Sequence, residues 1–319
     1  MVERLTAGGA FRCAGSARCA AAALALLLAS FDVAGESWRT GAPMLSERTE
    51  VAAAAIGREV FVVGGFGGTD ALEIYDTATD RWRRGPALPR GIHHAGAASA
   101  GGRLFVIGGY GNRWRPVDRV FEFDPIARAW RARAPMPTPR GALAVVELEG
   151  RIHAIGGVGS DGRNTGAHEI YDPVSDRWES GASLPTPRDH LAAGVLAGKI
   201  HVVGGRLEGS YARNLAAHEI YDPVVRKWVP GAPMPTPRSG IAAAVIEGQL
   251  LVLGGEAPSG TFATAEAYSA RTGTWRLRAP LPTARHGLAA VVVNGRLYAL
   301  SGGPRPGGSY SAINEIYEP

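Results

Sequence analysis

Five ionisable residues occupy two recurring positions of a repeated sequence unit: Glu50, His94, His190, Arg206 and Glu256. A carboxylate beside an imidazole can accept and return a proton, which is the chemistry of general acid–base catalysis. The same groups can also hold a ligand through charge-assisted hydrogen bonds. No local motif favours catalysis over binding. We therefore assign no catalytic residue and treat these side chains as candidates for ligand binding.

Histidines gather near these positions without the spacing of a metal motif. His94 and His190, with Asp189 and His286 one position earlier in their units, form a candidate polar cluster. Metal ligation would require several of these side chains to converge in space, and the sequence offers no short ligand spacing. The sequence therefore predicts no metal and no cofactor.

Aromatic and arginine side chains in variable segments form a second candidate group. Trp114 is the one Trp outside a recurring position, and Arg113 and Arg115 flank it. Such a side chain suits stacking on a carbohydrate or binding of an acidic peptide. The alternative is that Trp114 lies on a neighbouring loop. The predicted ligand-binding residues are Phe66, Tyr110, Trp114, Arg206, Tyr211, Arg213, Glu256, His94 and His190.

A unit that occurs six times must position these residues. Its double glycines stand at 64–65, 108–109, 156–157, 204–205, 254–255 and 302–303, a period of 44 to 50 residues. A fixed period of this size indicates a propeller or a solenoid. The third unit predicts four strands, at 141–147, 151–156, 167–172 and 177–181. Four strands in each of six units favour an all-β radial array.

The recurring residues resemble the kelch motif: a double glycine, a Tyr seven residues before a Trp, and Tyr-Asp-Pro ahead of a turn. The resemblance covers residues 36–319 and implies a six-bladed kelch β-propeller with four antiparallel strands per blade. The last unit lacks its Trp, whereas Trp38 precedes the first full unit. We therefore expect the strand around Trp38 to complete the C-terminal blade beside Ile316.

The resemblance also implies where a ligand would bind. In a propeller, the loops between second and third strands and between blades share one face, and we place the ligand-binding residues there. Kelch propellers that bind peptides are similar in carrying aromatic or Arg residues just after the double glycine. Phe66, Tyr110 and Arg206 match that placement, whereas Val158, Glu256 and Pro304 depart from it.

An Arg and a Glu occur in five units and disappear together from the second, which has Ile92 and Phe121 instead. An isolated buried charge is costly, whereas a pair replaced by apolar groups can be nearly neutral. We therefore predict a structural ion pair within each of these blades. The predicted pairs are Arg48–Glu73, Arg140–Glu169, Arg188–Glu219, Arg238–Glu266 and Arg285–Glu315.

Residues 1–35 have the features of a cleaved signal peptide. Three Arg precede the apolar run at 19–29, which is shorter than the ~20 residues needed to span a bilayer. The alternatives are an uncleaved anchor and a misassigned start codon. Cys13 and Cys19 both lie in this leader, so the predicted propeller domain, 36–319, has no thiol chemistry. This excludes the Cys–Tyr copper site of kelch-type oxidases.

Lys and Arg exceed Asp and Glu by 34 to 29 without a basic run, so we expect no nucleic-acid partner and no membrane insertion of the mature chain. The predicted function is a secreted or periplasmic, monomeric kelch-propeller module that binds a glycan or a protein segment through its loop-rich face. Resemblance to periplasmic kelch sugar epimerases implies an alternative, an epimerase or mutarotase acting in the channel mouth. A structural role in the cell envelope is a third reading.

Overall fold

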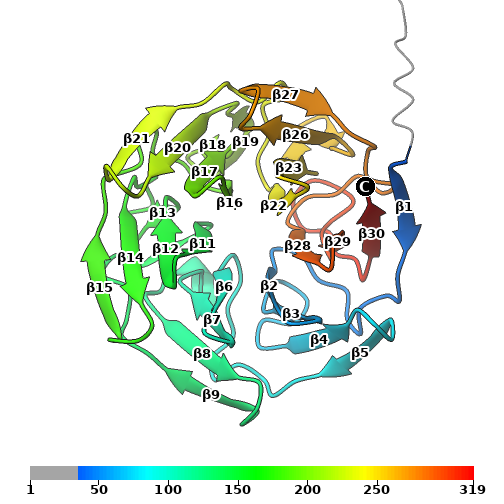
Figure 1. Cartoon of the computed structure of the whole chain (residues 1–319). Coiled ribbons are helices and arrows are strands. Elements are labelled where there is room, and N and C mark those ends of the chain that lie inside the picture. The colour runs from blue at the N-terminus through cyan, green and yellow to red at the C-terminus, as the bar shows by residue number, and fades with distance from the viewer. Residues whose placement is uncertain (1–34) are drawn as a thin grey trace, which may run out of the picture. The chain divides into compact units, whose positions relative to one another are not determined.

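The computed structural model describes residues 35–319. The predicted signal peptide, apart from its last residue, lies outside the described residues. Six four-stranded antiparallel sheets stand as blades around a central axis, and the first strand of each blade is innermost (Figure 1). The prediction of an all-β, six-bladed propeller is confirmed.

The first three blades follow one another along the chain. Blade 1 consists of β2 (Ala52–Ile56), β3 (Glu59–Val63), β4 (Leu72–Asp76) and β5 (Arg81–Arg84). Blade 2 consists of β6 (Gly96–Ala100), β7 (Arg103–Ile107), β8 (Val120–Asp124) and β9 (Ala129–Ala132). Blade 3 consists of β11 (Ala144–Leu148), β12 (Arg151–Ile155), β14 (His168–Asp172) and β15 (Arg177–Ser180).

The remaining blades complete the circle. Blade 4 consists of β16 (Ala192–Leu196), β17 (Lys199–Val203), β20 (His218–Asp222) and β21 (Lys227–Pro230). Blade 5 consists of β22 (Ala242–Ile246), β23 (Gln249–Leu253), β26 (Ala265–Ser269) and β27 (Thr274–Leu277). Blade 6 consists of β28 (Ala289–Val293), β29 (Arg296–Leu300), β30 (Asn314–Glu318) and β1 (Ser37–Thr40).

Short elements lie in the loops between these strands. They are the 3-10 helix η1 (Asn112–Trp114) and the ribbons β10 (Arg140–Gly141) with β13 (Val158–Gly159), β18 (Arg206–Leu207) with β19 (Ser210–Asn214), and β24 (Glu256–Ala257) with β25 (Gly260–Thr261). In blade 3 the first strand begins at Ala144, not at the expected residue 141. The reason is that 140–141 pairs with β13 and Ala142 has a φ of 54°, which interrupts the extended chain.

The N-terminal strand closes the ring. Strand β1 pairs antiparallel with the C-terminal strand β30, with Trp38 opposite Tyr317 and Arg39 opposite Ile316 (Figure 1). The indole Nε1 of Trp38 donates to the carbonyl of Ala279 in the preceding blade, at 2.9 Å. The other five fourth-strand Trp side chains make the same inter-blade bond, at 2.7–3.0 Å. The large aromatic rings thus join each blade to its neighbour.

Each of the five Arg–Glu pairs is in contact inside its own blade. The N···O distances are 3.5 Å for Arg48–Glu73, 3.0 Å for Arg140–Glu169 and 2.9 Å for Arg238–Glu266, and Arg188–Glu219 and Arg285–Glu315 also touch. All five Arg residues are fully buried. In blade 2, Ile92 and Phe121 belong to one apolar cluster instead.

These Arg side chains also satisfy backbone groups. Arg188 Nε donates to the carbonyl of Gly204 at 2.6 Å, and its Nη2 donates to Val202 at 3.1 Å. The paired Glu219 accepts from Thr186 Oγ1 at 2.8 Å. A Ser or Thr two residues before the Arg plays this part in all five blades, whereas blade 2 has Arg90 there. The ion pair is therefore one half of a larger buried hydrogen-bonded unit.

Candidate functional site

A closed ring of six peptide groups surrounds the channel mouth. The ring residues stand two positions after the buried Arg in five blades and after Ile92 in blade 2. Each ring amide donates to the carbonyl of its counterpart in the neighbouring blade, at 2.7–3.1 Å. Their φ angles all lie between 51° and 64°. The ring residues are Glu50, His94, Ala142, His190, Gly240 and Gly287.

The ring residues and the residues directly before the inner strands line a small open cavity. Its volume is about 100 Å³, and it has a polar and an apolar part. The polar side chains come from Glu50, His94 and His190, which belong to blades 1, 2 and 4. The apolar part comes from the residue that follows each ring residue, such as Val51 and Leu143. The site is therefore rigid in its backbone and variable in its side chains.

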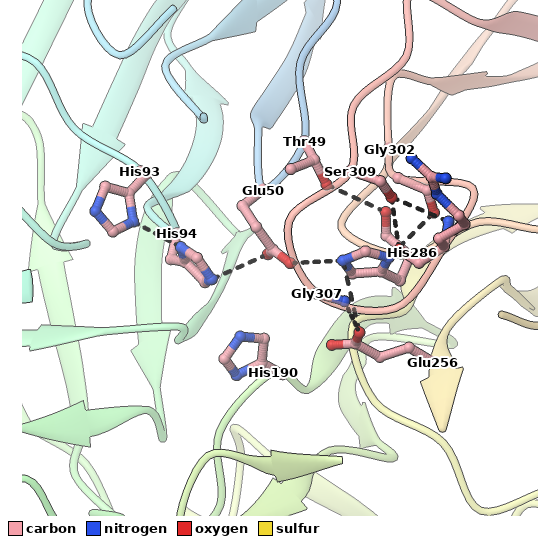
Figure 2. A network of polar contacts seen from close by, with 12 residues as sticks. Thr49, Glu50, His93, His94, His190, Glu256, His286, Gly302, Gly307 and Ser309 are labelled. Atoms are coloured by element: carbon pink, nitrogen blue, oxygen red, sulfur yellow. Dashed lines mark hydrogen bonds and ion pairs between the residues drawn. The ribbon is translucent and has the colours of Figure 1, made fainter. Parts of the chain in front are cut away.

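Glu50 lies between two histidines (Figure 2). Its carboxylate is 3.4 Å from His94 Nε2 and 3.8 Å from His286 Nε2. His286 Nε2 is also 3.6 Å from Glu256 Oε2, which accepts from the amide of Gly307 at 2.9 Å. Carboxylates and imidazoles from four blades thus face one another across the mouth.

Arg206 joins the other side of the mouth. Its guanidinium contacts Glu256 at 2.7 Å, Asp189 at 3.3 Å and His190 Nε2 at 2.8 Å. His190 Nδ1 lies 2.5 Å from Asp189 Oδ1, and Asn164 donates to the second carboxylate oxygen of Asp189 at 2.5 Å. Because Asp189 is fully buried, these partners replace its hydration.

Burial and charge set the protonation of this network. Burial, then the charges of His190 and His93, lower the pKa of His94 well below its usual range. Burial also lowers the pKa of His93 to about 4, although nearby Glu50 acts in the opposite direction. Burial alone would raise the pKa of Asp189, but its bond to His190 and its other polar partners lower it to about 2. Asp189 is therefore ionised and His94 neutral at pH 7.

An aromatic wall borders the network at blades 1 and 2. Phe66 stacks on His93 with ring centroids 4.2 Å apart, and Trp114 lies 5.3 Å from both Phe66 and Tyr110. Trp114 is also 5.3 Å from His94, and 57% of its surface is exposed. Trp114 thus packs on its neighbours, as the alternative held, and still presents an aromatic surface to solvent.

The long loop of blade 4 contributes unequally to the mouth. Arg206 lies 5.8 Å from the ring centroid of Tyr211, so these two predicted residues lie together. Arg213 contacts Glu208, and both side chains are exposed at the loop surface. Of the predicted binding residues in this loop, the structure brings Arg206 and Tyr211 toward the mouth and pairs Arg213 with the loop itself.

The sixth blade differs from the sequence pattern by one residue. Ser301 and Gly302, with φ of 63° and 101°, occupy the places of the two glycines in the other blades. A Cβ on Gly302 would lie 2.7 Å from the carbonyl of His286, which explains the glycine. The residue after this pair is therefore Gly303, which bridges to His286, and not the expected Pro304.

A third set of mouth residues stands one position before each ring residue, and sequence reasoning found only Asp189 and His286 of this set. Each residue of the set pairs, through its backbone, with the residue after the double glycine of its blade, or after Ser301-Gly302 in blade 6. Through this pairing Asp189 meets Arg206, His93 meets Tyr110 and Ser239 meets Glu256. The signal was present in the sequence, since Asp189 and His286 stand next to ring positions, but strand pairing was needed to join them to the loops.

The comparisons with known proteins agree with this architecture. A family model described as the Kelch motif matches residues 47–89, 92–137, 139–185, 187–235 and 237–282. These segments make up more than half of the sequence, and the chain belongs to the kelch family. Blade 6, split between the two ends of the chain, completes the six-bladed kelch propeller.

One similar solved structure is that of YjhT. It superposes with a TM-score of 0.76 at 17% identity, over 86% of this chain and 95% of that chain. At this identity the likeness concerns the fold. No curated protein matches the chain in sequence. Within the described residues, no helix has the length and apolar character to cross a membrane.

Proposed function

We propose that this propeller is a secreted or periplasmic binding module that takes a saccharide unit of a glycan at its channel mouth. The observation that carries the proposal is the exposed face of Trp114, which packs on His94. Through His94 and His190 it is connected to the buried network of Arg206, Glu256 and Asp189. A sugar ring offers an apolar face for aromatic stacking and hydroxyl groups for charged partners. Sites of this kind combine aromatic surface with a few placed polar groups.

The size of the mouth favours a glycan over a protein segment. The cavity of about 100 Å³ is closed at its sides by the peptide ring, so only a small group can enter. A protein segment would instead need an extended surface of roughly 800 Å² on each partner. The rim residues Tyr211 and Trp114 would then contact the sugars that follow the first.

The proposal is tested with glycan and peptide arrays, followed by calorimetry on the best ligand. Trp114→Ala is expected to weaken glycan binding by about tenfold or more, since exposed aromatic anchors dominate such interfaces. Val174→Ala is the matched control, because Val174 is 94% exposed in the blade 3 turn of the opposite face. Peptide binding alone, or glycan binding unchanged in Trp114→Ala, would overturn the proposal.

A second candidate function, sugar epimerisation or mutarotation, is favoured by the contacts of Glu50 with His94 and His286, since Glu50 and His94 line the cavity. Mutarotation needs a base that takes the proton of the anomeric hydroxyl and an acid that protonates the ring oxygen. Exchange between the anomers of reducing sugars, followed by NMR with and without the protein, distinguishes the two. Acceleration that is lost in Glu50→Gln would establish the enzyme.

The proposal that the protein is exported depends on the predicted signal peptide, residues 1–35. Glu36 Oε2 accepts from the amide of Ala279 at 2.9 Å and the carboxylate also contacts Arg278, so cleavage just before Glu36 would keep these contacts. N-terminal sequencing of the protein from its native host is expected to give a start near Glu36. A mature protein that retains residues 1–35 would contradict this part of the proposal.

A further inference from the structure

Three ring side chains converge on one point of the channel mouth. The ligand atoms of Glu50, His94 and His190 all lie within 4.8 Å of one another, and no other group of three His, Cys, Asp or Glu in residues 35–319 does so. The three residues belong to different blades, and the ring of backbone hydrogen bonds fixes their spacing. Metal ligation requires such a convergence, which the spacing of these residues in the sequence did not indicate.

The charges of the mouth favour a cation. The mouth contains three carboxylates, from Glu50, Asp189 and Glu256, and a single guanidinium, that of Arg206, which contacts Asp189 and Glu256. All four side chains are buried or nearly so, and an excess of buried charge is unfavourable unless it is balanced. The three carboxylates outnumber the guanidinium by two charges, which one divalent ion would balance.

The histidines are oriented as metal ligands usually are. His190 Nδ1 is bonded to Asp189, so its Nε2 is the nitrogen directed to the mouth. His94 Nδ1 is 2.7 Å from His93, and its Nε2 is directed to Glu50. A carboxylate behind a ligating imidazole is the usual outer partner of such a ligand.

We propose that Glu50, His94 and His190 bind a divalent first-row transition ion, with zinc as the fitting example. Two imidazoles and one carboxylate are a donor set for such ions and leave a position open toward the cavity. Ligands of a tetrahedral zinc ion lie about 3.3 Å apart. The present distance of 3.4 Å between His94 Nε2 and Glu50 Oε2 matches that spacing.

Arg206 is the competitor of the ion. Its Nη2 lies 2.8 Å from His190 Nε2, so the guanidinium and the ion would compete for the lone pair of this nitrogen. Arg206 can give up this bond and keep its bonds to Asp189 and Glu256. Removal of Arg206 should therefore strengthen metal binding, whereas it would weaken a network that is only hydrogen-bonded.

The test is equilibrium dialysis of the full chain against Zn²⁺, with a parallel Co²⁺ titration followed by visible absorption. Cys13→Ser and Cys19→Ser are included throughout, so that leader thiolates do not bind the ions. We expect one ion per chain. Glu50→Gln and His94→Asn should each weaken binding by about tenfold or more, and Arg206→Gln should tighten it by about tenfold.

The control is His201→Phe. His201 lies in strand β17, away from the ring, and Phe61 and Phe105 occupy its position in blades 1 and 2. It should bind the ion as the parent does. Much less than one ion per chain, no loss in Glu50→Gln and His94→Asn, or weaker binding in Arg206→Gln would each overturn the proposal. Should His94→Asn fail to fold, the opposite shifts of Glu50→Gln and Arg206→Gln decide. Glycan binding does not enter this test, so its outcome is independent of the proposed function.

Discussion

Two positions of the repeat, only two residues apart, behave in opposite ways. The first carries a buried Arg in five blades, and each Arg touches a Glu of the same blade. The second is the ring position, where the backbone is the same in all six blades but the side chain is Glu, His, Ala or Gly. A uniform backbone therefore does not require a uniform side chain.

The difference follows from what each side chain must satisfy. At the first position, Arg188 donates to the buried carbonyls of Gly204 and Val202 and contacts Glu219, so its side chain has several buried partners to satisfy. At the ring position, the backbone groups already bond one another, so the side chain is free to face the channel. Side chains with buried partners in their own blade repeat, and side chains that face the channel vary.

The largest expected effect tests the frame position. Arg188→Ala should lower the free energy of unfolding by ~3–5 kcal/mol, because it leaves the Glu219 carboxylate buried without its partner. Glu219→Ala should cost a similar amount. Arg188→Ile with Glu219→Phe, the pair found in blade 2 as Ile92 and Phe121, should recover most of the loss. Denaturant titration measures all of these variants.

An exposed ion pair provides the control for that series. Arg151 and Glu179 are 2.8 Å apart with about half of each side chain exposed, so Arg151→Ala should cost less than about 1 kcal/mol. If the Ala substitutions at 188 and 219 were additive when combined, the two residues would act independently and the frame interpretation would fail.

A smaller effect separates frame histidines from mouth histidines. In blade 3, His168 Nδ1 donates to Ala182 and its Nε2 accepts from His153 Nδ1 at 2.8 Å. Burial lowers the pKa of His168 to about 4 and that of His153 to about 3. Between pH 6.5 and 4 the unfolded chain therefore binds protons that the native state does not, and stability falls as the pH is lowered.

This loss should amount to about 3 kcal/mol for each histidine by pH 4. The double variant His153→Phe with His168→Leu copies Phe61 and Leu72 of blade 1 and should flatten the pH dependence over that range. Denaturant midpoints between pH 4 and 7 measure it. An unchanged slope in the double variant would show that the acid sensitivity comes from other buried histidines, either His201 and His218 of blade 4 or His93 and His94 of the mouth.

The frame was readable from the sequence because each of its signals occurs five or six times. The period, the closure by Trp38 and the joint loss of charge at Ile92 and Phe121 all needed only a comparison of one unit with another. The distances between ring residues could not be predicted in this way, because they depend on backbone hydrogen bonds between blades. These bonds bring Glu50, His94 and His190 together, although the three residues are far apart in the sequence.

The offset of blade 6 has the same origin. Ser301 adopts the left-handed conformation that the other blades give to glycine, so alignment on the double glycine selects Pro304 in place of Gly303. A residue type is an incomplete guide to conformation where tertiary contacts hold the backbone. The sequence could therefore predict which face carries the candidate site but not which residue of this loop lies at the mouth.

The smallest expected effect tests whether the hydrogen bonds of the ring hold non-glycine residues in a positive-φ conformation that they would otherwise avoid. Ala142 has a φ of 54°, a backbone conformation that is unfavourable for a residue with a Cβ atom. Its methyl group lines the cavity. Ala142→Gly should raise the free energy of unfolding by about 0.5–1 kcal/mol, because glycine adopts positive φ without steric cost. Denaturant titration beside Ala193→Gly, in the extended strand β16, gives the contrast, since glycine there should destabilise. If both variants destabilised the protein equally, ring and strand would not differ in the way the comparison requires.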